Sequence, residues 1–138
     1  MAIVTETLLV HCSHHRVARA SRKFVEEELQ IPEYDLLSVP GGPQFLRSLE
    51  YMPKFTWAGR RWLGFLVDAH RIRRVVLVGH ENCAWYRHLH GVHESHDHRL
   101  TEDLLHAAAV LREWFPGLRV EAYFATDLGG DASFLKVE

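Results

Sequence analysis

Apolar and polar residues alternate along this chain in blocks whose lengths predict short strands separated by helices. The clearest strand is residues 74–79, which are apolar without alternation, as in a strand covered on both faces of a parallel sheet. Shorter apolar or β-compatible runs predict the other strands, which are residues 7–11, 34–39, 118–125 and, at an edge, 134–137.

Apolar residues at helical spacing fill most of the intervals between these strands. The stripe is regular in residues 55–70, and Thr101 is a favourable N-cap for a helix with two acidic residues in its first turn. Pro32 and the turn at 40–43 interrupt the pattern. One predicted helix begins at Arg16 and ends before Pro32. Three others cover residues 44–50, 55–70 and 84–89, and the last extends from Thr101 to Phe115.

This order of elements predicts the α/β class. We expect a mainly parallel four-stranded sheet with an antiparallel edge strand and with helices on both faces. A length of 138 residues suits one domain, so residues 1–138 are expected to form a single domain.

Composition excludes several classes of partner. The chain is 47% hydrophobic and 25% charged, and its net charge is −2, so neither nucleic acid nor an anionic membrane is an expected partner. The N-terminal residues lack the pattern of a secretory signal, which favours a cytoplasmic location. In that location the two cysteines are expected to be free thiols or metal ligands rather than a disulfide.

Two polar segments directly follow predicted strands, and each contains one of the two cysteines. The first segment is residues 11–16 and the second is residues 80–83. If the two strands are neighbours in one parallel sheet, Cys12, His80 and Cys83 meet at its carboxyl edge, where ligands bind in such sheets. Two thiolates and one imidazole make a Zn²⁺ site with a fourth position to fill. The plainer alternative is two small buried cysteines and a turn histidine.

These segments have the spacings C-x-x-x-R, from Cys12 to Arg16, and H-x-x-C, from His80 to Cys83. With this order of elements, the chain resembles the β-class carbonic anhydrases over nearly its whole length. The resemblance implies that Cys12, His80 and Cys83 bind catalytic zinc. It also implies a homodimer and reversible hydration of carbon dioxide by zinc-bound hydroxide.

The sequence departs from that family at position 14, where the pattern has an aspartate and this chain has His14. A neutral imidazole there can accept a hydrogen bond from zinc-bound water, or bind zinc and close a Cys2His2 site, or point away. Arg16 then lacks its family partner and either binds an anion such as bicarbonate or is a solvated residue at a helix start. His14 and Arg16 are the predicted catalytic residues.

Other functions and sites remain open at this stage. One alternative is a non-catalytic zinc protein with a closed site, and another is hydrolysis of carbonyl sulfide or carbon disulfide. A thiol-nucleophile enzyme using Cys12 is also possible, since a helix N-terminus lowers the pKa of a thiol. Eleven histidines are present, five of them within residues 88–98, and this run is expected to be a solvated loop rather than a second metal site or proton-transfer loop.

Overall fold

The computed structural model describes residues 3–47 and 53–138, and within them one mostly parallel sheet has the strand order β2-β1-β3-β4-β5. β1 to β4 are parallel, and β5 pairs antiparallel with β4. The predicted α/β class and the antiparallel edge strand are confirmed. The strands are β1 (Thr7–Cys12), β2 (Asp35–Val39), β3 (Arg74–His80), β4 (Arg119–Thr126) and β5 (Ser133–Lys136).

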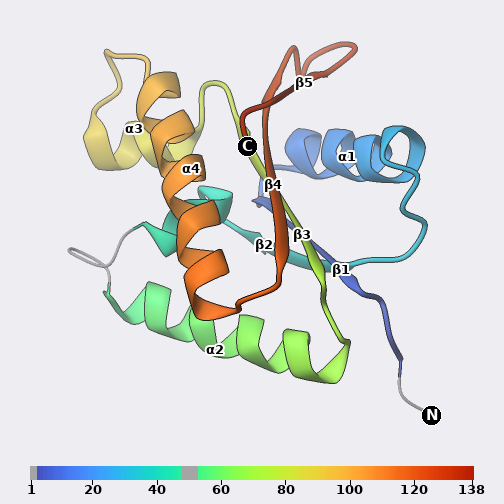
Figure 1. Cartoon of the computed structure of the whole chain (residues 1–138). Coiled ribbons are helices and arrows are strands. Elements are labelled where there is room, and N and C mark those ends of the chain that lie inside the picture. Colours follow the sequence, from blue (N-terminus) through green and yellow to red (C-terminus); the bar gives the residue numbers. More distant parts are fainter. Residues whose placement is uncertain (1–2, 48–52) are drawn as a thin grey trace.

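Helices cover both faces of the sheet, as the sequence predicts. Figure 1 shows α2 and α4 on one side and α1 on the other. Successive side chains of β1 point to opposite faces of the sheet. Leu8 and Val10 pack in the core under α2 and α4, whereas Leu9 packs with Phe24 on the other face. The helices are α1 (His15–Lys23), which continues as a π-helical turn (Phe24–Glu28), α2 (Pro53–Ala69), α3 (Ala84–His90) and α4 (Asp97–Trp114).

Two helix boundaries differ from those predicted. α4 begins at Asp97 rather than after Thr101, and the Thr101 hydroxyl lies inside the helix, where it donates to the Asp97 carbonyl oxygen over 2.9 Å. In place of a helix over residues 44–50, Gly42–Leu46 forms a 3-10 turn, and residues 48–50 lie outside the described part.

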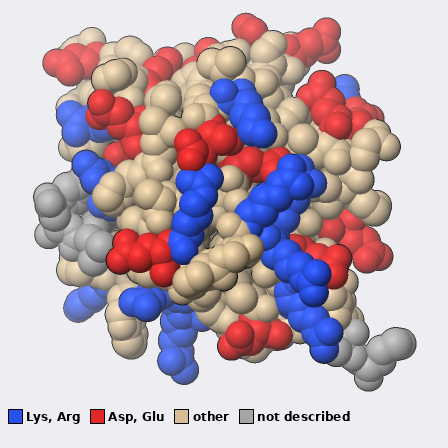
Figure 2. Space-filling view, viewed as in Figure 1, with Lys and Arg blue, Asp and Glu red and all other residues tan. Residues whose placement is uncertain are grey.

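The sheet order places the two cysteine-containing segments side by side. β1 lies between β2 and β3, so the carboxyl ends of β1 and β3 are neighbours. Basic and acidic side chains are interspersed on the face seen in Figure 2, consistent with the small net charge. Among the described residues, no helix is both long enough and apolar enough to cross a bilayer.

Candidate metal centre

Cys12 ends β1, and the turn after β2 packs directly onto it. Gly41 and Gly42 have φ angles of 78° and 58°, and a Cβ on Gly42 would lie 2.9 Å from the backbone nitrogen of Cys12. Only glycine combines that conformation with so close an approach. Gly42 therefore lets the turn after β2 lie against the backbone of the metal-ligand candidate Cys12.

His80 ends β3, and Cys83 is the N-cap of α3. The loop between them is fixed to the β4–β5 turn, because the backbone N–H of Asp127 donates to the Glu81 carboxylate over 2.7 Å. Within the loop, Asn82 has a left-handed φ of 52°, a conformation that asparagine adopts more readily than most residues. This loop brings Cys83 back toward His80.

The three predicted ligands form one group in the structure. The ligand atoms of Cys12, His80 and Cys83 all lie within 4.8 Å of one another, and all three residues are buried. Tetrahedral zinc with two thiolate ligands separates the sulfur atoms by about 3.8 Å, so one ion can bridge the group after small side-chain adjustments. In the part of the chain that is described, this is the only such group of three or more ligand residues.

The imidazole of His80 is oriented as a metal ligand requires. Its Nδ1 lies 2.7 Å from the Glu81 carbonyl oxygen and therefore has the proton. The lone pair is then on Nε2, which is buried and has no hydrogen-bond partner among the described residues. A buried acceptor left unpaired is costly, and a cation would satisfy it. The donor set therefore fits a soft divalent cation such as zinc.

The two thiols share a proton when no cation separates them. Hydrogen bonding from Cys83, opposed by burial, holds the pKa of Cys12 far below its usual value. Hydrogen bonding to Cys12 and burial raise the pKa of Cys83 well above its usual value. One sulfur is thus already a thiolate, and a bound cation would displace the remaining proton.

His14 and Arg16, the predicted catalytic residues, are exposed and lie outside the group of three. His14 is the N-cap of α1, and its Nδ1 accepts the backbone N–H of Arg16 over 3.1 Å. The Arg16 guanidinium lies toward the β4–β5 turn, where its Nη1 is 3.9 Å from the position of a Cβ on Gly129. A catalytic role for either residue stays a prediction.

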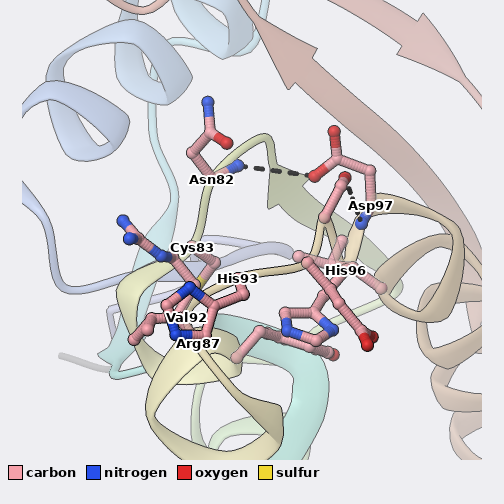
Figure 3. Close-up of a pocket in the computed structure, with 11 residues that line it drawn as sticks. Asn82, Cys83, Arg87, Val92, His93, His96 and Asp97 are labelled. Carbon is pink, nitrogen blue, oxygen red and sulfur yellow. Dashed lines mark hydrogen bonds between the residues drawn. The ribbon is translucent and has the colours of Figure 1, made fainter.

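The histidine-rich run forms one wall of a cavity of about 290 Å³ that reaches Cys83. Figure 3 shows Cys83, Arg87, His93 and His96 around it. His96 is only 8% exposed, so the solvated-loop prediction is wrong for this residue, whereas His98 at the outer end is exposed. The sequence placed His96 in the histidine-rich run without showing that it is buried, and no motif pointed to Arg87 beside Cys83.

Comparison with known families and structures agrees with this geometry. The family model described as "Putative carbonic anhydrase" matches residues 4–134. The chain therefore belongs to that family, and its fold is that of the β-carbonic anhydrases, as the resemblance implies. A search of curated proteins finds no significant match.

Three solved structures illustrate the likeness of the fold. A carbonic anhydrase from Glaciozyma antarctica has a TM-score of 0.65 at 15% identity, covering 100% of this chain and 85% of the other. One from Streptococcus mutans has a TM-score of 0.62 at 13% identity, covering 99% and 84%. The apo form of a carbon disulfide hydrolase has a TM-score of 0.58 at 13% identity, covering 90% and 76%.

Proposed function

We propose that this protein is a zinc enzyme that reversibly hydrates carbon dioxide at Cys12, His80 and Cys83. The proposal depends on one observation, the convergence of these three ligand atoms with the lone pair of His80 unpartnered. Zinc bound there would acidify a coordinated water toward neutral pH and so supply the nucleophile. Burial of the three residues keeps bulk water from competing for the ligands.

We further propose that the fourth metal position is open. His14 Nδ1 accepts a hydrogen bond from Arg16, so in the neutral ring the proton is on Nε2. A ring with one nitrogen protonated and the other used as an acceptor has no lone pair left for a metal. This argues against the closed Cys2His2 alternative and leaves His14 an Nε2–H donor toward substrate oxygen.

Arg16 is proposed to bind the bicarbonate anion. Its guanidinium is exposed close to the carboxyl edge of the sheet, and a planar guanidinium matches a planar oxyanion. Arg16→Gln should then raise the KM for bicarbonate dehydration more than it lowers kcat. A fall in kcat with an unchanged KM would contradict an anion-binding role.

Metal analysis and stopped-flow kinetics test the proposed function together. One zinc per chain is expected in the purified protein, with much less in Cys83→Ser and an unchanged content in the control His98→Ala, whose ring is exposed. Zinc-loaded protein should hydrate carbon dioxide, and the same preparation is assayed with carbonyl sulfide and carbon disulfide. Absence of stoichiometric zinc refutes the proposal, and turnover of a sulfur substrate alone favours the hydrolase alternative.

We also propose that the active protein is a homodimer. α2 exposes four large aromatic side chains, a surface typical of protein interfaces. They are Phe55, Trp57, Trp62 and Phe65, exposed by 55%, 72%, 54% and 65%. Sedimentation equilibrium should find a dimer for the wild type and a monomer for Trp62→Glu, and a monomeric wild type would contradict the proposal. The single domain and the cytoplasmic location stay predictions.

A further inference from the structure

Glu81, the residue after the ligand His80, joins that ligand to the last parallel strand of the sheet. Its backbone N–H donates to the Ala125 carbonyl oxygen over 3.0 Å, and its carboxylate accepts the backbone N–H of Asp127 over 2.7 Å. On its other side, the Glu81 carbonyl oxygen accepts Nδ1–H of His80 over 2.7 Å. The same residue is thus bonded both to the end of β4 and to the metal-ligand ring.

The turn between β4 and β5 has a fixed position to which Glu81 is attached. Leu128 in this turn packs against the cores on both faces of the sheet. Within the turn, the Gly130 N–H donates to the Asp127 carbonyl oxygen over 3.0 Å, and β5 then pairs back onto β4. The Glu81 carboxylate is therefore bonded to a part of the chain that the core holds in place.

The carbonyl that orients His80 belongs to the peptide between Glu81 and Asn82, and this peptide lies in a turn. Asn82 is exposed and has a left-handed φ of 52°, so no strand or helix fixes the direction of that carbonyl. The N–H of the same peptide lies 3.4 Å from an Asp97 carboxylate oxygen, which is longer than an ordinary hydrogen bond. The bond of 2.7 Å to the Glu81 carboxylate is the tighter restraint on this loop.

The direction of this carbonyl decides whether His80 can bind a cation. While the carbonyl accepts Nδ1–H, the lone pair of the neutral ring is on Nε2, which is buried and has no partner among the described residues. If the carbonyl turned away, the ring could take its proton on Nε2 instead, and a protonated Nε2 does not bind a metal.

We propose that Glu81 is a positioning residue whose carboxylate, bonded to the β4–β5 turn, holds its own carbonyl oxygen against His80 and so keeps Nε2 available to the metal. Glu81 acts through His80, since it lies outside the group of three ligand residues. What the role requires of the side chain is an acceptor at the reach of a glutamate, not a negative charge. This inference rests on the proposed metal site.

Three substitutions of Glu81 separate the hydrogen bond from the charge. Glu81→Gln loses the charge but keeps an oxygen acceptor at the same reach, so its zinc affinity should stay close to that of the wild type. Glu81→Asp keeps the charge on a side chain one methylene shorter, and Glu81→Ala loses both. These two should bind zinc about 10-fold more weakly in competition with a chromophoric chelator, as expected for loss of an outer-shell contact. Asp131→Ala, which removes an exposed acid from the same turn, is the control and should bind as the wild type does.

The tautomer of His80 in the metal-free protein gives a readout that a general loss of stability would not change. Long-range ¹H–¹⁵N NMR should show the Nδ1–H form in the wild type and in Glu81→Gln. In Glu81→Ala and Glu81→Asp the same ring should show a mixture of the two neutral forms. Urea unfolding of each variant measures stability alongside.

Failure of this role and failure of the proposed function give different results. A wild type that binds no zinc refutes the proposed function, and the tautomer of His80 then still tests Glu81. Equal zinc affinity in the wild type, Glu81→Asp and Glu81→Ala refutes the role of Glu81 alone. Tight binding by Glu81→Asp with weak binding by Glu81→Gln also refutes it, because the charge would then be the cause. A fall in stability with the His80 tautomer unchanged would overturn it as well.

Discussion

Replacing His14 separates the open from the closed metal site. The His14 ring is exposed, and its Nδ1 accepts an N-cap hydrogen bond of 3.1 Å from the backbone N–H of Arg16. Loss of an N-cap acceptor costs about 1 kcal/mol. For a chain of 138 residues this corresponds to a fall in Tm of about 3 °C in His14→Ala. His14→Asp keeps an acceptor at the cap and should retain the stability of the wild type.

The open and the closed form of the metal site predict different effects of His14→Ala on zinc affinity. With an open site, His14→Ala should bind zinc as tightly as the wild type in competition with a chromophoric chelator. If the site is closed, His14→Ala removes a zinc ligand. Removing even an outer-shell partner lowers metal affinity by about 10- to 100-fold, so removing a ligand should lower the zinc affinity by more than that. His15→Ala, one residue further on and also exposed, is the matched control.

Hydration rate gives the third measurement on position 14. A carboxylate accepts a hydrogen bond from the reacting water, which an Nε2–H donor does not do, so His14→Asp should raise kcat/KM. The assay is stopped-flow hydration with a pH indicator. If His14→Ala binds zinc tightly and His14→Asp shows no gain in kcat/KM, position 14 is not the site of the missing acceptor. If His14→Ala binds zinc more weakly than the wild type, the site is not open.

Three further substitutions test other contacts. Gly42→Ala places a Cβ 2.9 Å from the Cys12 nitrogen at a φ of 58°, and should cost roughly 2–3 kcal/mol in urea unfolding and weaken zinc binding, whereas Gly130→Ala, with open space around its Cβ, should do neither. Burial raises the pKa of Glu121, but the hydrogen bonds from Arg74 and Tyr123 and the charge of Arg74 outweigh burial, so the pKa lies below its usual value. A lowered folded pKa stabilises the protein fully above the unfolded pKa of about 4.5, and this contribution to the free energy of unfolding should be lost as the pH falls through the lower, folded pKa of Glu121. Arg74→Met should cost about 3 kcal/mol at pH 7, and less in acid once the pH has fallen below the lowered pKa of Glu121; a cost that does not change with pH would contradict the ion pair. Excess zinc should raise the Tm of wild type but not of Cys12→Ser, and an equal rise in both would place zinc elsewhere.

The ligand group was predictable because strand order alone brings its members together. Apolar runs identify β1 and β3, and the sequence predicts that Cys12 and His80 meet if these two strands are neighbours in a parallel sheet, which the structure confirms. The tautomer of His80 was not predictable, since it depends on the carbonyl of Glu81 in a loop with a left-handed Asn82. Sequence spacing does not encode such local backbone conformation.

The histidine-rich run shows a different limit. Its irregular spacing has no strand or helix period, so a solvated loop was the reasonable expectation. The structure instead turns the chain at Gly91, with a φ of 114°, and buries His96 against the Gly91 carbonyl. α4 consequently starts at Asp97, whose carboxylate lies 3.4 Å from the backbone nitrogen of Asn82. This contact joins the start of α4 to the loop that leads to Cys83, and both residues line the cavity.

Position 14 has two requirements that a sequence pattern does not separate. The start of α1 needs a side-chain acceptor for the Arg16 N–H, and either imidazole Nδ1 or a carboxylate provides one. The chemistry needs an acceptor near the metal, which the carboxylate provides while its second oxygen caps the helix. An imidazole has one acceptor in its neutral form, and the cap occupies it. Histidine at this position therefore preserves the fold and removes the acceptor.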